Sequence, residues 1–189
     1  MSEADFLALV RRNAANAALL ERLPALALPD AYLAAGCLFQ AVWNQRGGRA
    51  PDWGVRDYDV FYFDPGDLSA DAEARIEARV RQITADLGVT VEVKNQARVH
   101  TWYRDWFGAD YPPLRCTREG IERFLVACTC VGIRLGDGAL HAPGGLDDLW
   151  RGVLRINPRH AMPALFSAKA LSYQRRWPWL TVVEPAAVA

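Results

Sequence analysis

The sequence predicts a protein of the α/β or α+β class. Strand-like and helix-like periods alternate through the first half of the chain, and a glycine-centred hairpin signal lies in the second half. With 189 residues, of which 51% are hydrophobic, the chain is long enough for one domain with its own core. We therefore expect a single domain over residues 1–189, with an N-terminal helical segment at 1–28 and a C-terminal helix and tail at 161–189.

The first part of the chain is expected to form a helix, a strand and a second helix. Apolar residues recur near the helical period over residues 3–22, which predicts one amphipathic helix there. The apolar stretch "AYLAAG" predicts a short strand that ends in a turn at Gly36. The following "CLFQAVWNQ" has the spacing of a helix, and the glycines and proline of residues 46–54 predict a loop.

The middle of the chain contains two predicted strands with a helix between them. The segment "VRDYDVFYFD" at 55–64 is rich in Val, Tyr and Phe, which suits a strand. Ser69 is a suitable N-cap for a helix over 70–87, which Gly88 ends. "VTVEVKN" at 89–95 alternates Val with polar residues, which predicts a second strand with one polar face. "QARVHTWYRDWFG" is expected to be helical.

The last part of the chain is expected to be mostly helical around one hairpin. A helix is predicted over 117–127, and "GDG" between "CVGIRL" and "ALHA" predicts a hairpin turn. Asp147 and Asp148 suit the positive end of a short helix dipole. A last helix over 161–176 precedes "WPW", which we interpret as a hydrophobic anchor.

Charge and composition limit the expected partners and location. The 22 acidic and 22 basic residues balance and no basic tail is present, so binding to a long nucleic acid is not expected. No apolar run reaches the ~20 residues that cross a bilayer, and the N-terminus lacks the features of a signal peptide. We expect a cytoplasmic protein with no membrane partner. Reduced and mostly buried thiols are expected at Cys37, Cys116, Cys128 and Cys130.

Carboxylates on the two predicted middle strands form a candidate metal site. Asp57 and Asp59 are two residues apart, so they point to one face of their strand, where like charges repel and burial is costly. Glu92 adds a carboxylate on the next strand. Such oxygen ligands could hold Mg²⁺ or Mn²⁺ and support phosphoryl transfer. Alternatively, the aspartates mark a strand end near solvent, and Glu92 lies on a solvated face.

Several residues could bind a nucleotide. Free backbone N–H groups at a glycine turn before a helix are suited to phosphate oxygens, and polar residues from the second strand onward could contact phosphate or base. The candidate nucleotide-binding residues are Gly36, Cys37, Lys94, Asn95, Arg98 and His100. The last four could equally form the polar face of a strand and a helix. His100 with Trp102 and Tyr103 suggests a platform for a nucleobase, although aromatic residues at such spacing more often belong to a core.

The order of "AAGCLFQAVWN", "RDYDVFYFD", "VEVKNQARVHTWY" and "HAPGGLDDLW" resembles a bacterial family of nucleotidyltransferase-like proteins. That family belongs to the superfamily of DNA polymerase beta, CCA-adding enzymes and aminoglycoside nucleotidyltransferases. The resemblance covers about residues 30–160. "DYDV" is similar to the Asp-x-Asp strand of the superfamily, "VEV" to its third-acid strand, and Gly36 to the glycine before its first helix.

The resemblance implies a minimal nucleotidyltransferase fold, a mixed sheet flanked by helices. It also implies transfer of a nucleotidyl group from an NTP, with Mg²⁺ (or Mn²⁺) held by Asp57 and Asp59. Glu92 would ligate the catalytic ion or act as a base. The acceptor and the oligomeric state are not specified. The alternative is a non-catalytic module that retains the fold and binds a nucleotide or a partner protein. The three acids favour the enzyme, whereas Cys37, at a position where many members have Gly or Ser, favours the module.

Overall fold

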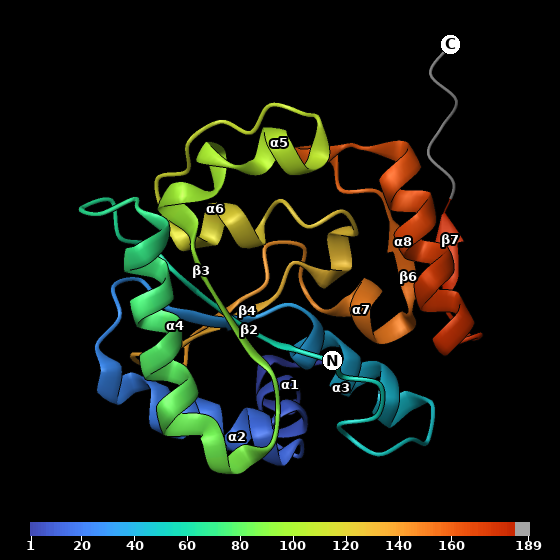
Figure 1. Cartoon of the computed structure of the whole chain (residues 1–189). Helices are drawn as coiled ribbons and strands as arrows, with labels where there is room; N and C mark the ends of the chain where they lie inside the picture. Colours follow the sequence, from blue (N-terminus) through green and yellow to red (C-terminus); the bar gives the residue numbers. More distant parts are fainter. Residues whose placement is uncertain (184–189) are drawn as a thin grey trace.

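The structure is a computed structural model that describes residues 1–183, so the end of the predicted tail, residues 184–189, lies outside the described residues. Its centre is a five-stranded mixed sheet in the order β3-β2-β1-β4-β5. Figure 1 shows β2, β3 and β4 of this sheet in the middle of the molecule. The strands are β1 (Tyr32–Ala34), β2 (Tyr58–Tyr62), β3 (Val91–Asn95), β4 (Gly132–Arg134) and β5 (Leu140–His141). Only β2 and β3 pair in parallel, and the other neighbours are antiparallel. The predicted class, mixed sheet and β4–β5 hairpin are therefore confirmed.

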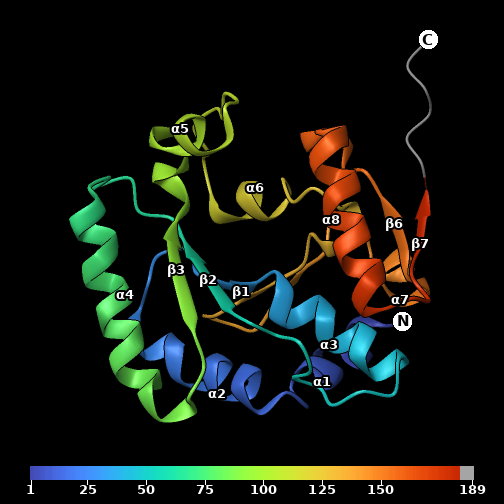
Figure 2. The same ribbon diagram turned by 45° about the vertical axis from the view of Figure 1, so that its right-hand side comes forward.

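Helices cover both faces of this sheet. In Figure 2, α4 lies on one side of β2 and β3, and α8 lies on the other. The α-helices are α1 (Glu3–Val10), α2 (Ala14–Arg22), α3 (Gly36–Arg46), α4 (Ala70–Thr84), α5 (Tyr103–Phe107), α6 (Thr117–Ile121), α7 (Asp147–Arg151) and α8 (Pro163–Arg176). Short 3₁₀ helices are η1 (Leu23–Leu26), η2 (Ala85–Leu87), η3 (Gln96–Thr101), η4 (Ala127–Thr129) and η5 (Pro158–His160). A two-stranded parallel sheet is formed by β6 (Val153–Arg155) and β7 (Thr181–Val183).

Two predicted helices are shorter than expected. The single helix over 3–22 is wrong because α1 ends at Val10 and Asn13 then caps α2. The Asn13 side chain accepts hydrogen bonds from the backbone N–H groups of Ala15 at 3.0 Å and Asn16 at 3.2 Å. An Asn side chain competes with helical backbone bonds in this way, so it favours a cap over a helix interior. The helix predicted over 117–127 ends at Ile121, and the residues after it form turns and η4.

An aromatic cluster fixes α8 against α3. Trp43 of α3 lies 5.3 Å from Trp177 and 5.1 Å from Tyr173 between ring centroids. The Trp177 indole N–H donates to Asn44 Oδ1 at 2.9 Å, so its polar group is satisfied where the ring is buried. This confirms the expected anchor role of "WPW" for Trp177. Among residues 1–183, no helix has the length and apolar character to span a bilayer.

Replacing Trp177 with Ala should lower the free energy of unfolding by about 3–5 kcal/mol, because it leaves a large cavity and removes the donor to Asn44 Oδ1. Denaturant melts measure this loss. The matched control is Trp106→Ala, because the Trp106 side chain is 79% exposed and its loss should cost less than about 0.5 kcal/mol. Equal losses in the two variants would contradict the anchor role.

Candidate functional site

A cavity of about 810 Å³ lies over β2, between α3 and α8. Successive side chains of β2 point to opposite faces of the sheet. Tyr58, Val60 and Tyr62 are buried on one face, whereas Asp59 and Phe61 line the cavity on the other. Since α4 packs on the buried face, the cavity face of β2 is the one that α8 covers (Figure 2). The strand thus presents Asp59 and Phe61 to the cavity, while Tyr58, Val60 and Tyr62 complete the core.

The three predicted acids share this face of the sheet. Asp59 is the register partner of Glu92 in the parallel β2–β3 pair, so their side chains point to the same side. Asp57 and Asp59 both line the cavity. Glu92 is exposed at the adjoining sheet edge, where it borders a smaller hollow of about 390 Å³ together with Lys94. Within residues 1–183, no three His, Cys, Asp or Glu side chains form a ready-made metal-binding group.

Asp59 is the most perturbed acid of the site. Burial, and then the charges of Asp57 and Glu92, raise the pKa of its carboxyl to about 7, while Lys169 and Lys94 act in the opposite direction. Within the described part of the chain, none of the three acids forms an ion pair. Crowded carboxylates without a cationic partner have the donor chemistry that Mg²⁺ or Mn²⁺ requires, so these residues fit such an ion.

The turn before α3 approaches the acids closely. Ala35 has a φ of 60° and α3 begins at Gly36 with no side-chain cap, so the first N–H groups of the helix are left without an intrahelical partner. A Cβ on Gly36 would lie 2.7 Å from Gln40 Nε2 and 3.9 Å from Asp57 Oδ1. A larger residue at this position would have to displace the Gln40 side chain, and Ala35 and Gly36 place the start of α3 at the cavity.

The Cys37 side chain does not face the cavity. It is fully buried, and its Sγ lies 3.4 Å from the Ala34 carbonyl oxygen. Burial raises the pKa of this thiol well above its ordinary value. Within residues 1–183 all four cysteines are unpaired, and Cys37, Cys128 and Cys130 are buried, as expected for reduced thiols, while Cys116 is partly exposed.

The other candidate nucleotide-binding residues lie outside the cavity lining. Asn95 is buried, and its side chain accepts from Asp64 N at 3.0 Å and donates to Asp64 O at 2.8 Å. Arg98 forms a largely buried ion pair with Glu73 at 2.7 Å, and Glu73 also accepts from Asn95 N at 2.7 Å. These contacts tie α4 to β3 and η3. They give Asn95 and Arg98 a structural role that the sequence pattern left open.

Lys94 and His100 are also apart from the cavity. Lys94 borders the smaller hollow beside Glu92, and His100 Nδ1 is buried without a hydrogen-bond partner in the described structure. From the proposed aromatic platform, only Tyr103 lines the cavity, together with Phe107 and His160. The Tyr103 hydroxyl is 2.9 Å from His160 Nε2. The aromatic wall is therefore built from two distant parts of the chain.

Sequence reasoning missed the cations of the cavity. Arg56 and Arg123 line it, and α8 adds Lys169, Arg175 and Arg176. Lys169 and Arg176 are seven residues apart, which places both on one face of α8. That spacing is visible in the sequence, but it gains meaning only once α8 is known to cover Asp59.

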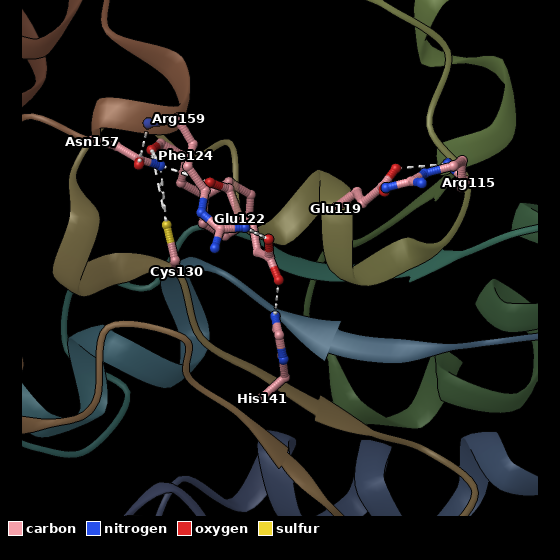
Figure 3. Close-up of polar contacts among 8 residues, drawn as sticks. All are labelled: Arg115, Glu119, Glu122, Phe124, Cys130, His141, Asn157 and Arg159. Carbon is pink, nitrogen blue, oxygen red and sulfur yellow. Dashed lines mark hydrogen bonds and ion pairs between the residues drawn. The ribbon is translucent and has the colours of Figure 1, made fainter.

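A polar network holds the wall opposite the sheet (Figure 3). Asn157 Nδ2 donates to the carbonyl oxygens of Glu122 and Phe124, both at 2.7 Å. The Glu122 carboxylate contacts the Arg159 guanidinium and lies 3.1 Å from His141 Nε2, a contact poorly aligned for a hydrogen bond. These contacts fix residues 122–124 and η5, which carry Arg123 and His160 to the cavity.

Comparison with known proteins agrees with this geometry. A family model described as nucleotidyltransferase matches residues 21–182. A solved structure described as "The NMR structure of the protein reveals a CCA-adding enzyme head domain" has 24% sequence identity and a TM-score of 0.77, and the alignment covers 97% of each chain. At that identity the structural likeness shows the fold. A search of curated proteins gave no match.

The raised pKa of Asp59 predicts how pH affects the stability of the metal-free protein. The folded-state pKa of about 7 exceeds the ordinary 3.8, so Asp59 lowers the free energy of unfolding of wild type progressively as pH rises between these values. Asp59→Asn removes this loss of stability. In EDTA, the stability of the variant relative to wild type should therefore rise by about 2 kcal/mol from pH 5 to pH 8.

Denaturant melts across that range provide the measurement, with Asp86→Asn as the control. Arg22 lowers the pKa of Asp86, so the contribution of Asp86 to stability is lost only on acidification below about 3.8. The stability difference between Asp86→Asn and wild type should therefore stay constant over pH 5–8. A stability difference between Asp59→Asn and wild type that is also constant over this range would show that Asp59 ionises freely in the folded protein.

Proposed function

The chain belongs to the nucleotidyltransferase family whose model matches residues 21–182, and on that premise we propose that it moves a nucleoside monophosphate from an NTP to an acceptor hydroxyl with the help of Mg²⁺ or Mn²⁺. The observation that carries the proposal is Asp59: a partly buried carboxylate crowded by Asp57 and Glu92, without an ion-pair partner among the described residues, beside a large cavity. A purely structural acid would be paired or solvated.

Each part of the site has a proposed task. Asp57 and Asp59 would hold the ion, with Glu92 adding a ligand or accepting the proton of the acceptor hydroxyl. When bound, the divalent ion would neutralise phosphoryl charge and lower the pKa of that hydroxyl. The Gly36 turn would donate backbone N–H groups to the outer phosphates. Lys169 from α8 would face the reacting phosphate beside Asp59.

The reaction is a substitution at the α-phosphorus of the NTP. The acceptor oxygen forms a bond to that phosphorus as the bond to the bridging oxygen of pyrophosphate breaks, and pyrophosphate leaves with the bonding electron pair. The hydroxyl proton passes to a carboxylate and then to solvent. Positioning and charge stabilisation supply most of such catalysis, which suits a cavity lined by acids and cations.

The second candidate is a non-catalytic module that retains the fold. Two observations favour it: Cys37 has no hydroxyl and its thiol is buried away from a triphosphate, and Glu92 stands outside the cavity lining. Such a module would bind nucleotide without consuming it. Release of pyrophosphate from each NTP in the presence of cell extract separates the two candidates.

The double variant Asp57→Asn with Asp59→Asn should lose Mn²⁺-dependent nucleotidyl transfer and Mn²⁺-induced thermal stabilisation, yet keep or raise its stability in EDTA. Both amides are nearly isosteric with the acids and remove their repulsion. Glu77→Gln, at the smaller hollow, is the control and should retain the Mn²⁺ response. A loss of about 3–5 kcal/mol in EDTA would instead identify a structural charge cluster.

A further inference from the structure

The cavity has a surplus of positive charge. Five cationic side chains line it, against the two carboxylates of Asp57 and Asp59. Within residues 1–183, none of the five forms an ion pair with a carboxylate. Arg123 and Arg176 are partly buried, whereas the other three are exposed. Leaving a partly buried cation unpaired is costly, so an anionic ligand would be favourable at these two residues. The five residues are Arg56, Arg123, Lys169, Arg175 and Arg176.

Most of these cations gather near the Gly36 turn, which we call the glycine end of the cavity. Arg176 donates to Gln40 Oε1 at 3.2 Å and to Gly54 O at 3.3 Å, and Gln40 in turn lies against Gly36. Asp57 and the guanidinium of Arg56 act on the pKa of Arg176, so they are its neighbours. This end has the acids, the free N–H groups and the cations that a metal-bound triphosphate needs.

Arg123 lies at the other end, with Tyr103, Phe107 and His160, which we call the aromatic end. Its guanidinium is 4.7 Å from the Tyr111 ring centroid, and Tyr103 lies 4.4 Å from Tyr111 and 4.6 Å from Phe107 between centroids. Helix α8 begins just after His160 and ends at Arg176, so it runs from the aromatic end to the glycine end. Phe124, the next residue after Arg123, lies 6.0 Å from Phe61 of β2 between ring centroids, which keeps this end close to the strand that carries Asp59.

The acids adjacent to Arg123 in the chain are occupied elsewhere (Figure 3). Glu119 pairs with Arg115, at 2.6 Å. Glu122 contacts Arg159 and His141. The fold therefore holds Arg123 at the cavity without an ion pair to either carboxylate. Hydrogen bonds from Arg115 lower the pKa of Glu119, and the charge of Arg123 still adds to this effect.

The chemistry of a nucleotide does not account for this guanidinium. A triphosphate at the glycine end carries its charge next to Asp57 and Asp59, and the nucleoside that extends from it is uncharged. Stacking on Tyr103 and Phe107 would serve a base or another flat group without any cation. A guanidinium fixed against an aromatic ring is instead preorganised for two-pronged binding of a phosphate or carboxylate.

We infer that the acceptor carries its own anionic group, of the phosphate class, and that Arg123 binds it at the aromatic end while the acceptor hydroxyl reaches the acids. The identification of the bound compound as the acceptor rests on the proposed function, but binding of an anion at Arg123 does not require catalysis. It narrows the acceptor to small phosphorylated compounds with a free hydroxyl. Arg123 is then a specificity-determining residue.

The test measures binding of glycerol 3-phosphate, with glycerol as its uncharged counterpart, to the full chain by NMR. Titrations are run in the free protein and in the presence of Mn²⁺ and the α,β-methylene analogue of ATP, which cannot transfer its nucleotide. We expect wild type to bind glycerol 3-phosphate in both conditions and glycerol in neither. Arg123→Gln should raise the Kd for glycerol 3-phosphate about tenfold or more.

Four controls make the result decisive. Arg123→Lys keeps the positive charge but lacks the bidentate donor geometry of the guanidinium, so its Kd for glycerol 3-phosphate should be intermediate. Arg118→Gln removes an exposed cation outside the cavity lining and should change the Kd by less than about twofold. Thermal melts verify that each variant is folded. The affinity for the ATP analogue should also change by less than about twofold in Arg123→Gln.

Two outcomes overturn the inference: no binding of glycerol 3-phosphate to wild type, or a Kd in Arg123→Gln equal to that of wild type. A tenfold loss of affinity for the ATP analogue in Arg123→Gln would assign Arg123 to the nucleotide and also overturn it. If the analogue fails to bind wild type in Mn²⁺ while the Arg123-dependent binding of glycerol 3-phosphate persists, the proposed function fails and the anion site stands.

Discussion

Repulsion among the carboxylates of Asp57, Asp59 and Glu92 is the constraint on which the rest of the site depends. Parallel pairing in register brings Asp59 beside Glu92, and the two-residue strand period adds Asp57 to the same face. Burial then disfavours the charge of Asp59. A strand in this position could carry apolar side chains at lower cost, so the carboxylates are best understood as chemical groups that the surrounding core has to support.

The support comes from parts of the chain that are distant in sequence. Trp43 and Trp177 pack α8 against α3, and this contact places Lys169 over Asp59 and Arg176 near the Gly36 turn. The aromatic cluster thus stabilises the core and also positions the cationic residues of α8 at the cavity. Stability and proposed chemistry are coupled here, because loosening α8 would also displace its cations.

Buried polar networks perform the same task on the other walls. Glu73 joins Arg98 and the backbone of Asn95, which fixes the end of β3 against α4. Asn157 and Glu122 fix the segment that carries Arg123. In each case a hydrogen-bonded group with no place in the cavity lining holds the backbone from which a lining residue or a site strand projects. This distinguishes residues that position the site from residues that would contact a ligand.

The sequence by itself determined the mixed class, most strands, the helix over α4 with its Ser69 cap, and the acids Asp57 and Asp59, because these depend on local period and local chemistry. It could not decide between a solvated polar face and a binding role for Asn95 and Arg98, since that depends on which distant groups pair with them. It also gave no reason to select Lys169, Arg176 or Arg123. Only tertiary packing placed these residues at the cavity, because α8 and the segment after α6 reach it through contacts between residues far apart in the chain, which local pattern does not encode.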